Sequence, residues 1–307
     1  MPTESLKHKR VGQWKLLGRI GRGGTSDIYR AIHETTNREA AVKVLLPECC
    51  ADKKRVKAFQ TEYEILQSLK HPAIPKAFAT DTVDDRPCII MALCEGDDLR
   101  LYVSEKRKFD RVGCFLSATK TVSYLHSQGW THGDIKVENF VLGSDGRLRM
   151  VDFGNVSRSS GTRSFLRALT KNELHGTPSY LAPELLKGKA PTPASDVYAL
   201  GCLAYILTAG RPPIYHPDRD TMLRMILSED APDLMKLEPS VPKTLANIIH
   251  RCIAREREAR FEDATELLSM LELFFKKAGN PPPHEISRLI IRRLRANAES
   301  VESSASS

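Results

Sequence analysis

Two short polar motifs near the middle of the chain contain the residue types that phosphoryl transfer requires. The first motif reads HGDIKVEN, and the second, which follows it along the chain, reads DFG. Asn139 and Asp152 offer the hard oxygen ligands that Mg²⁺ takes alongside nucleotide phosphates. Asp134 can orient a hydroxyl group and accept its proton, and Lys136 can neutralise charge that develops on a transferred phosphoryl group. The two motifs therefore predict a base, a cation and a metal site.

A lysine and a glutamate nearer the N-terminus both fall on predicted apolar faces. In the predicted strand at 39–46, a period of two puts Lys43 on the same face as Ala41 and Leu45. In the helix that follows, Glu62 lies within the apolar stripe formed by Phe59, Leu66 and Leu69. Two buried charges are tolerated only when they pair, so the pattern predicts a Lys43–Glu62 ion pair. The alternative is a lysine that points outward and a glutamate at the edge of the core.

Three glycines precede this strand, in the segment IGRGGTSDIYR. Gly21, Gly23 and Gly24 lie between two apolar runs, as in a hairpin. Without a Cβ atom, backbone N–H groups can approach phosphate oxygens closely. The segment is thus a candidate phosphate-binding loop, with an ordinary hairpin turn as the alternative.

The composition excludes several protein classes. The 307 residues include 46 Lys and Arg against 38 Asp and Glu, a net charge of +8, with 41% hydrophobic and 27% charged residues, which is typical of a globular protein. No basic stripe with interleaved aromatic residues indicates nucleic-acid binding. The apolar stretch 197–210 is too short to span a bilayer, and the N-terminus lacks the apolar core of a signal peptide. Seven cysteines without a C-x-x-C pair indicate reduced thiols, so we expect a cytoplasmic protein.

Hydrophobic periodicity divides the chain in two. Residues 14–91 are rich in strand patterns and contain one long helical pattern, whereas residues 99–275 are mainly helical. The predicted helices in the second part cover residues 113–127, 196–208, 245–254 and 264–275. The change of pattern near residues 92–98 predicts a boundary between two lobes.

The order of the motifs closely resembles that of eukaryotic-like, bacterial-type Ser/Thr protein kinases. The matching motifs are GRGGTSDI, AAVK, the helix glutamate, HGDIKVEN, DFG, APE (182–184) and DVYALG (196–201), and together they cover about residues 12–276. The resemblance implies an α+β, two-lobed kinase fold with a small β-rich N-lobe and a large, mainly helical C-lobe. The implied parts are an N-terminal extension (1–11), the N-lobe (12–91), a hinge (92–98), the C-lobe (99–276), and a linker, basic amphipathic helix and disordered tail (277–307).

The resemblance also implies roles for individual residues, with ATP and Mg²⁺ as cofactors. Asp134 would be the catalytic base, Lys136 the γ-phosphate contact, and Asn139 and Asp152 the metal ligands. Thr177 would help to hold Asp134 and Lys136. Lys43 would bind the α- and β-phosphates, positioned by Glu62, beneath the loop of Gly21, Gly23 and Gly24. The adenine site would comprise Ile20, Ile28, Ala41 and Val141, with Met91 as gatekeeper and Ala92, Leu93 and Cys94 as the hinge. Glu184 would pair with Arg260, and Asp196 would anchor the backbone of the catalytic loop.

The implied reaction transfers the ATP γ-phosphoryl group to Ser or Thr hydroxyls of proteins. Lys136 and the Gly176-Thr177-Pro178 segment follow the Ser/Thr pattern, and we expect autophosphorylation among Ser157, Ser159, Ser160, Thr162, Ser164 and Thr170. A pseudokinase scaffold or nucleotide-binding module is the first alternative, and a small-molecule kinase is the second. The expected partners are protein substrates, without nucleic acid or an integral membrane contact. The basic helix near the C-terminus either packs on the C-lobe or contacts an anionic membrane surface or a regulator.

Two positions depart from the family pattern. Ser26 replaces the third glycine of the phosphate-binding loop, and Gly133 stands where many kinases have arginine before the catalytic aspartate. That arginine normally receives the phosphate of the activation loop. Its absence predicts an enzyme that is active without phosphorylation of this loop.

Overall fold

The computed structural model describes residues 6–158 and 178–277, which form two compact units. The first unit extends to Gly96 and also includes residues 141–154, and the second contains residues 97–140 and the chain from Asn155 onward. The sequence placed all of 99–276 in the second lobe. Residues 141–154 instead join the first unit, where the Met150 N–H donates to the Ala73 carbonyl at 2.8 Å.

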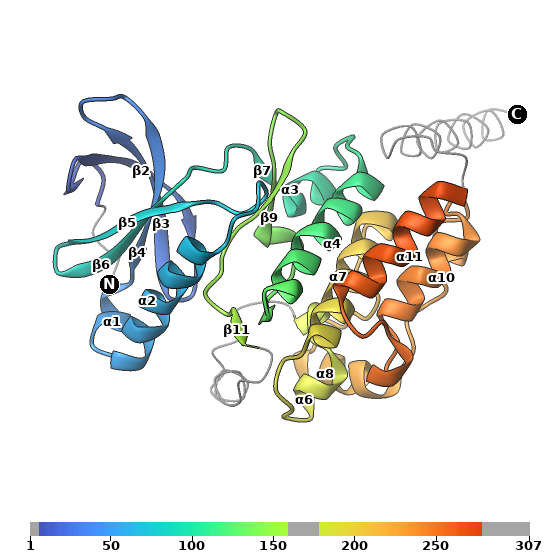
Figure 1. Cartoon of the computed structure of the whole chain (residues 1–307). Helices are drawn as coiled ribbons and strands as arrows, with labels where there is room; N and C mark the ends of the chain where they lie inside the picture. Colours follow the sequence, from blue (N-terminus) through green and yellow to red (C-terminus); the bar gives the residue numbers. More distant parts are fainter. Residues whose placement is uncertain (1–5, 159–177, 278–307) are drawn as a thin grey trace, which may run out of the picture. The chain divides into compact units, whose positions relative to one another are not determined.

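The first unit is built on a six-stranded sheet. Its strands are β1 (Arg10–Val11), β2 (Trp14–Arg22), β3 (Ser26–His33), β4 (Glu39–Leu45), β5 (Ala77–Val83) and β6 (Arg86–Met91). Their order is β1-β2-β3-β4-β6-β5, and every neighbouring pair is antiparallel. The unit also contains α1 (Pro47–Cys50) and α2 (Lys53–Ser68), and the hairpin strands β9 (Phe140–Leu142) and β10 (Leu148–Met150) bring in residues 141–154. Figure 1 shows this β-rich part, with α2 as its long helix.

One face of the sheet forms the hydrophobic core of the first unit. Tyr29 and Ala31 of β3, Val42 and Val44 of β4, and Ile90 of β6 are buried in one hydrophobic cluster. All residues of β4 from Ala40 to Leu45 are buried, so both faces of this strand are covered. The opposite face of β4 therefore carries Lys43 into a buried environment.

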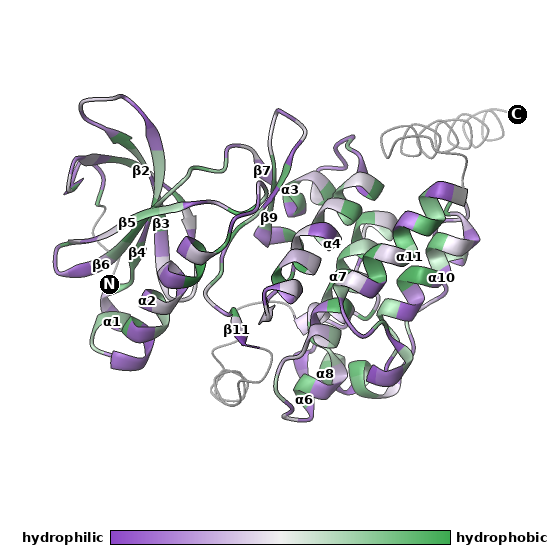
Figure 2. Cartoon of the chain, in the orientation of Figure 1, coloured by the Kyte–Doolittle hydropathy of each residue, from purple (hydrophilic) through white to green (hydrophobic). Residues whose placement is uncertain are grey.

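The second unit is mainly helical. Its elements include α3 (Leu99–Ser104), α4 (Arg111–Ser127), α6 (Pro183–Leu186), α7 (Pro193–Ala209), α8 (Arg219–Ser228), α9 (Leu234–Leu237), α10 (Lys243–Cys252) and α11 (Ala264–Lys277). Short pieces complete it: β7 (Asp97–Asp98), β8 (Trp130–Thr131), β11 (Ser157–Arg158) and the 3₁₀ turns η1 (Val137–Asn139), η2 (Pro178–Tyr180) and η3 (Arg257–Ala259). The four predicted helices are confirmed as α4, α7, α10 and α11, with ends that differ by a few residues. Helices α10 and α11 mix hydrophobic and hydrophilic residues, as amphipathic helices do (Figure 2).

Helix α7 is the central helix of this unit. It starts with a capping box between Thr192 and Ser195 and ends at Gly210 in the left-handed conformation. Most of its residues are buried on all sides. A Cβ atom on Gly201 would lie 2.5 Å from the Cβ of Cys252, so only glycine allows α7 and α10 to approach this closely.

A buried ion pair joins the start of α6 to the loop before α11. Arg260 donates from Nη1 and Nη2 to the two carboxylate oxygens of Glu184, both at 2.8 Å. The Arg260 side chain is 0% exposed and the Glu184 side chain 7% exposed. The guanidinium also donates to three backbone carbonyls and lies 4.8 Å from the ring centroid of Tyr198. The expected Glu184–Arg260 pair is thus present, with its hydrogen-bonding groups well satisfied.

Replacing Arg260 by methionine should lower the free energy of unfolding by about 3–5 kcal/mol, because Glu184 would stay buried without its partner. Chemical denaturation of the full chain measures this loss. The control Arg257→Met changes an exposed side chain and should shift stability by less than about 0.5 kcal/mol. Adding Glu184→Leu to Arg260→Met should recover part of the loss. Equal stability of Arg260→Met and the control would contradict the role of this pair.

All seven cysteines are free, as the sequence predicts. Burial raises the pKa of the Cys88 thiol to about 12 and that of the Cys94 thiol to about 11. These two groups are therefore protonated at neutral pH.

None of the helices in the described ranges is long and apolar enough to cross a bilayer. The predicted C-terminal helix and tail, as well as Thr177 and most of the expected phosphorylation sites, lie outside the described residues.

Candidate active site

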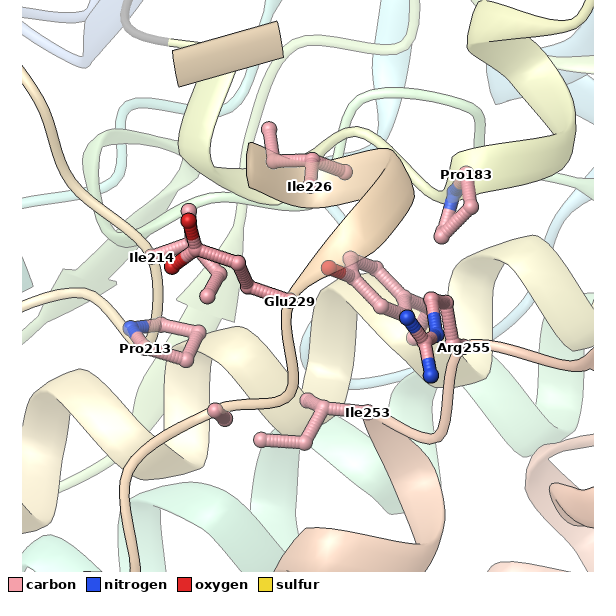
Figure 3. Close-up of a pocket in the computed structure, with 9 residues that line it drawn as sticks. Pro183, Pro213, Ile214, Ile226, Glu229, Ile253 and Arg255 are labelled. Atoms are coloured by element: carbon pink, nitrogen blue, oxygen red, sulfur yellow. The ribbon is translucent and has the colours of Figure 1, made fainter. Parts of the chain in front are cut away.

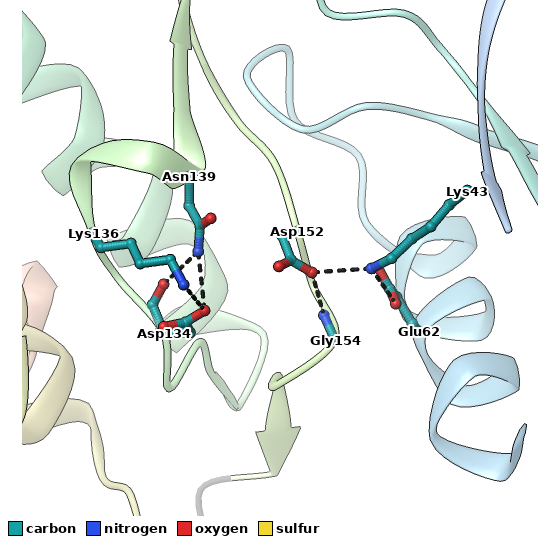
Figure 4. A network of polar contacts seen from close by, with 7 residues as sticks. All are labelled: Lys43, Glu62, Asp134, Lys136, Asn139, Asp152 and Gly154. Atoms are coloured by element: carbon teal, nitrogen blue, oxygen red, sulfur yellow. Dashed lines mark hydrogen bonds and ion pairs between the residues drawn. The ribbon is translucent and has the colours of Figure 1, made fainter. Parts of the chain in front are cut away.

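Lys43 is the centre of a buried charge cluster in the first unit (Figure 4). Its Nζ donates to both carboxylate oxygens of Glu62, at 2.6 and 2.8 Å, and to Oδ1 of Asp152 at 3.0 Å. The Lys43 and Glu62 side chains are 6% and 4% exposed. The ion pair predicted from strand and helix periodicity is confirmed, and the outward-pointing alternative is wrong.

The protonation states follow from the same contacts. Burial alone would lower the pKa of Lys43, but the negative charges of Asp152 and Glu62 outweigh it and raise the pKa above its ordinary value. Burial raises the pKa of Glu62, against the opposing effect of Lys43. Lys43 is therefore an ammonium ion at neutral pH, oriented by two carboxylates. This fixed cation is suited to binding phosphate oxygens.

Asp152 has a backbone conformation that non-glycine residues rarely adopt. Its φ is +63°, and its Oδ1 accepts from the Gly154 N–H at 3.4 Å as well as from Lys43. Its side chain is 40% exposed, in contrast to the two residues that it contacts. The left-handed conformation costs free energy and is found mainly where function requires it. The partly exposed carboxylate of Asp152 can be reached by a hard cation.

The glycine-rich segment forms the turn between β2 and β3. Gly21 pairs with Ile28 across the two strands, and the Gly23 N–H donates to the Ser26 carbonyl at 2.8 Å. Ser26 is 3% exposed, whereas Gly24 and Ile20 are exposed, Ile20 to 54%. The predicted hairpin is confirmed. The residues at its tip, 22–25, are exposed, so a ligand can approach their backbone.

Four of the residues expected around adenine, Ile20, Ile28, Ala41 and Met91, lie on strands of the six-stranded sheet, and residues 92–94 follow β6 without regular structure. Ile28 pairs with Lys43 between β3 and β4, and Ala41 pairs with Met91 between β4 and β6. Ala41 and Met91 are buried and Ile20 is exposed. The remaining members of this set are partly exposed: Ile28, Ala92, Leu93, Cys94 and Val141. Partly exposed apolar side chains next to a buried cation suit a planar base carrying phosphates. Their roles in binding stay predictions.

The loop of residues 132–139, the catalytic loop that the resemblance implies, forms a second polar cluster, in the second unit (Figure 4). Lys136 Nζ donates to Asp134 Oδ2 at 2.7 Å, and both side chains are about one third exposed or less. Asn139 Nδ2 donates to the Asp134 carbonyl at 2.7 Å and to Oδ2 at 3.3 Å. The amide nitrogen of Asn139 is thus occupied, which leaves its oxygen as the ligand atom. A carboxylate, an ammonium ion and an amide oxygen are brought together as the sequence predicts.

Asp196, at the start of α7, holds the backbone of this loop. Its carboxylate accepts from the His132 N–H at 2.6 Å and from the Gly133 N–H at 2.9 Å. His126 also contacts Asp196. The Nδ1 atom of His126 accepts from the Ala264 N–H at 3.1 Å, so the ring proton is on Nε2. This Nε2–H group donates to the Asp196 carboxylate at 3.1 Å. The expected anchoring by Asp196 is present, and the contribution of His126 was not predicted. Its position at the end of the amphipathic pattern of α4 gave no signal beyond an ordinary core histidine.

Replacing Asp196 by asparagine should lower kcat for the expected phosphoryl transfer by about tenfold or more. Asp196 accepts from the His132 N–H with Oδ2 and from the Gly133 N–H with Oδ1, and asparagine replaces one of these oxygens by a donor, so one buried N–H loses its partner at about 1–3 kcal/mol. Steady-state kinetics of the full chain measures this effect. The matched control is Asp263→Asn, because Asp263 also accepts two backbone N–H bonds but is partly exposed at a helix start, where asparagine serves equally well. An unchanged kcat for Asp196→Asn would contradict the anchoring role.

The donor set fits Mg²⁺ better than a transition metal. Within residues 6–158 and 178–277, no group of three or more His, Cys, Asp or Glu side chains is arranged to hold a metal ion. Mg²⁺ commonly takes only one or two carboxylates and completes its shell with water and phosphate oxygens. The carboxylate of Asp152 in the first unit and the amide oxygen of Asn139 in the second unit are ligand types of this kind, and their joint binding of Mg²⁺ stays a prediction.

A separate pocket in the second unit lacks such chemistry. It is lined mainly by apolar residues, including Pro183, Ile214, Ile226 and Ile253 (Figure 3). Its charged residues are Glu229 and Arg255, and Arg255 is already engaged by the Ser228 carbonyl and Asp230. The candidate functional residues are therefore the Lys43 cluster of the first unit and the Asp134 cluster of the second unit, each taken by itself.

Comparison with known proteins gives the family. The family model described as protein kinase domain matches residues 14–271, which is most of the chain. The chain belongs to the protein kinase family. The β-rich first unit and the helical second unit agree with the expected α+β kinase fold.

Several relatives of this protein kinase are Ser/Thr protein kinases by name. It is 28% identical over 271 residues to the serine/threonine-protein kinase PrkC of Bacillus subtilis, covering 87% of this chain and 41% of PrkC. It is 30% identical over 272 residues to the DNA damage-responsive serine/threonine-protein kinase RqkA of Deinococcus radiodurans, covering 86% of this chain and 40% of RqkA. It is 30% identical over 273 residues to RAC-beta serine/threonine-protein kinase A of Xenopus laevis, covering 86% and 54%. The kinase thus spans between two fifths and just over half of the length of these relatives.

Proposed function

We propose that this chain is a Ser/Thr protein kinase that transfers the γ-phosphoryl group of ATP to protein hydroxyls with the help of Mg²⁺. The observation that carries the proposal is the buried Lys43, which is held by Glu62 and Asp152 at hydrogen-bonding distance. A buried cation between two carboxylates is costly for a purely structural role. The burial of Lys43 is explained if its ammonium group binds the phosphates of a nucleotide.

Each charged residue has a distinct part in the proposed reaction. Lys43 binds the α- and β-phosphates, and the backbone of Gly21, Gly23 and Gly24 covers the phosphate chain. Bound Mg²⁺ would neutralise phosphate charge, held by Asp152 and the amide oxygen of Asn139. Asp134 orients the acceptor hydroxyl and takes its proton, while Lys136 stabilises the charge on the transferred group.

A pseudokinase that binds nucleotide without turnover is the competing function. A scaffold of this kind does not require a base, a phosphate-binding lysine and two metal ligands at once. The contacts of Asp134 with both Lys136 and Asn139 favour an enzyme, because they pre-organise the base and the ligand. The seven free thiols agree with a reducing compartment, and we infer that the enzyme works in the cytoplasm.

Incubation of the chain with γ-labelled ATP tests the function. Label should be transferred to the protein itself and to a generic basic substrate protein, should depend on Mg²⁺, and should be recovered as phosphoserine or phosphothreonine. Mg²⁺-dependent nucleotide binding without transfer would favour the pseudokinase. Label transferred only to a small molecule would favour a small-molecule kinase.

A further inference from the structure

The strand that leads into the catalytic loop is paired with the segment that follows Gly154. Strand β11 runs antiparallel to β8, with Ser157 opposite Thr131 and Arg158 opposite Trp130. A ladder of two residue pairs is too short to be stable by its backbone hydrogen bonds alone. Side-chain contacts must therefore contribute to holding this junction together.

Arg158 makes two such contacts. Its guanidinium carbon lies 4.1 Å from the ring centroid of Trp130, the arrangement of a cation–π interaction. Its Nη1 donates to the Gln128 carbonyl at 3.3 Å. In the part of the chain that the structure describes, no carboxylate lies within ion-pair distance of Arg158. The tryptophan ring and one carbonyl are thus its recorded partners.

The segment that follows Gly154 also approaches the catalytic loop at Gly133. This residue has a φ of +74°, and a Cβ atom there would lie 3.2 Å from the carbonyl oxygen of Asn155. The loop and the following segment therefore approach each other through their backbones, without a side chain at position 133. Gly133 has no guanidinium group that could bind a phosphate. The guanidinium group of Arg158, in β11, instead contacts Trp130 in β8.

β8 is connected to Asp134, the proposed catalytic base, by a short buried stretch of backbone, so a displacement of β8 would also move Asp134. Thr131 and His132 are both 0% exposed, and they separate Trp130 from Gly133 and Asp134. His132 and Gly133 are fixed from one side by Asp196. The β8–β11 junction fixes the same stretch of backbone from its N-terminal end.

We propose that Arg158 is a positioning residue, which by stacking on Trp130 keeps the catalytic loop in its active arrangement without a phosphate on the activation loop. The inference rests on the proposed kinase function. It gives a structural reason why the kinase would be active without phosphorylation of the activation loop. It requires the pairing of the arginine with the aromatic ring, not its charge alone.

The test compares variants of the phosphatase-treated full chain. Arg158→Leu should lower kcat/KM for a protein acceptor by about fivefold, the size of one exposed cation–π contact, and leave the KM for ATP unchanged. Trp130→Leu should cause the same loss, and the double variant no further loss, because both changes remove one interaction. Trp130→Phe, which keeps an aromatic ring, should retain most of the activity.

Arg251→Leu is the matched control. Arg251 is also an exposed arginine stacked on an aromatic ring, at 3.9 Å from the Phe261 ring centroid, in the same unit. Its loss should leave kcat/KM unchanged and should lower the melting temperature at least as much as Arg158→Leu does. A structural role of Arg158 would instead make its activity loss follow its loss of thermal stability.

Hydrogen exchange of the backbone amides of residues 130–134 gives a readout without turnover. Exchange there should be faster in Arg158→Leu than in the unaltered chain and in Arg251→Leu. Equal exchange, full activity of Arg158→Leu, or an inactive dephosphorylated chain that regains activity on phosphorylation would overturn the inference. A chain that never transfers phosphate but shows the expected exchange difference would refute the proposed function and leave the positioning of the loop by Arg158 standing.

Discussion

Replacing Asp134 by asparagine should lower kcat for phosphate transfer by about 10²–10⁴-fold, the usual contribution of a general base. The amide keeps the size and most of the contacts of Asp134 but cannot accept the proton of the acceptor hydroxyl. Asp134 also receives hydrogen bonds from Lys136 and Asn139, so the substitution disturbs the pre-organised cluster. Initial rates at saturating ATP measure the loss.

The matched control for this prediction is Asp218→Asn. Asp218 caps helix α8 by accepting from the Thr221 N–H at 2.7 Å, and asparagine caps a helix equally well. Its rate should equal that of the unaltered chain. Nucleotide affinity should be the same in all three proteins, because Asp134 is proposed to contact the acceptor. A rate for Asp134→Asn within a few fold of the control would remove Asp134 as the base.

Replacing Asp152 by asparagine should reduce transfer by at least about 10²-fold, because the metal supplies several kcal/mol of charge stabilisation in the transition state. The neutral amide is a weaker ligand for Mg²⁺ than the carboxylate. The carboxylate also lies 3.0 Å from Lys43 Nζ, and its negative charge is one of the causes that raise the pKa of Lys43. The substitution therefore weakens both the metal site and the orientation of the phosphate-binding lysine.

A titration of nucleotide binding with Mg²⁺ distinguishes this effect from general damage. The unaltered chain should bind ATP more tightly as Mg²⁺ is added, and Asp152→Asn should lose this dependence. Asp145→Asn is the control in the same unit, since Asp145 pairs with Arg149 in an exposed hairpin. Normal Mg²⁺ dependence in Asp152→Asn would contradict the assignment of this residue as a metal ligand.

The Lys43–Glu62 pair shows what sequence periodicity can predict. Both residues occupy apolar faces of regular elements, and burial of one charge requires the other, so the pair follows from local patterns. The third member of the cluster could not be found in this way. Asp152 is separated from Lys43 by more than a hundred residues, and its contact depends on 141–154 joining the first unit.

Contacts that depend on the path of the chain were also beyond prediction. No local pattern places Arg158 opposite Trp130, because a two-residue strand pair gives no periodic signal. The left-handed backbone conformation of Asp152 could not be predicted either, because nothing in the sequence around an aspartate indicates a positive φ. By contrast, the role of Asp196 followed from the family motif, and the structure supplies the hydrogen bonds that explain it. The close approach of α7 and α10 at Gly201 emerged only from the structure.

The most direct test of the kinase function is to identify where the γ-phosphoryl group of ATP goes. The unaltered chain, labelled ATP and Mg²⁺ are incubated with a basic substrate protein, and the label is divided among protein hydroxyls, water and small molecules. We predict that most of the label is found on serine and threonine and that none of this transfer occurs with Asp134→Asn. Label that remains on ATP although the nucleotide is bound, or that appears only in inorganic phosphate, would contradict a protein kinase.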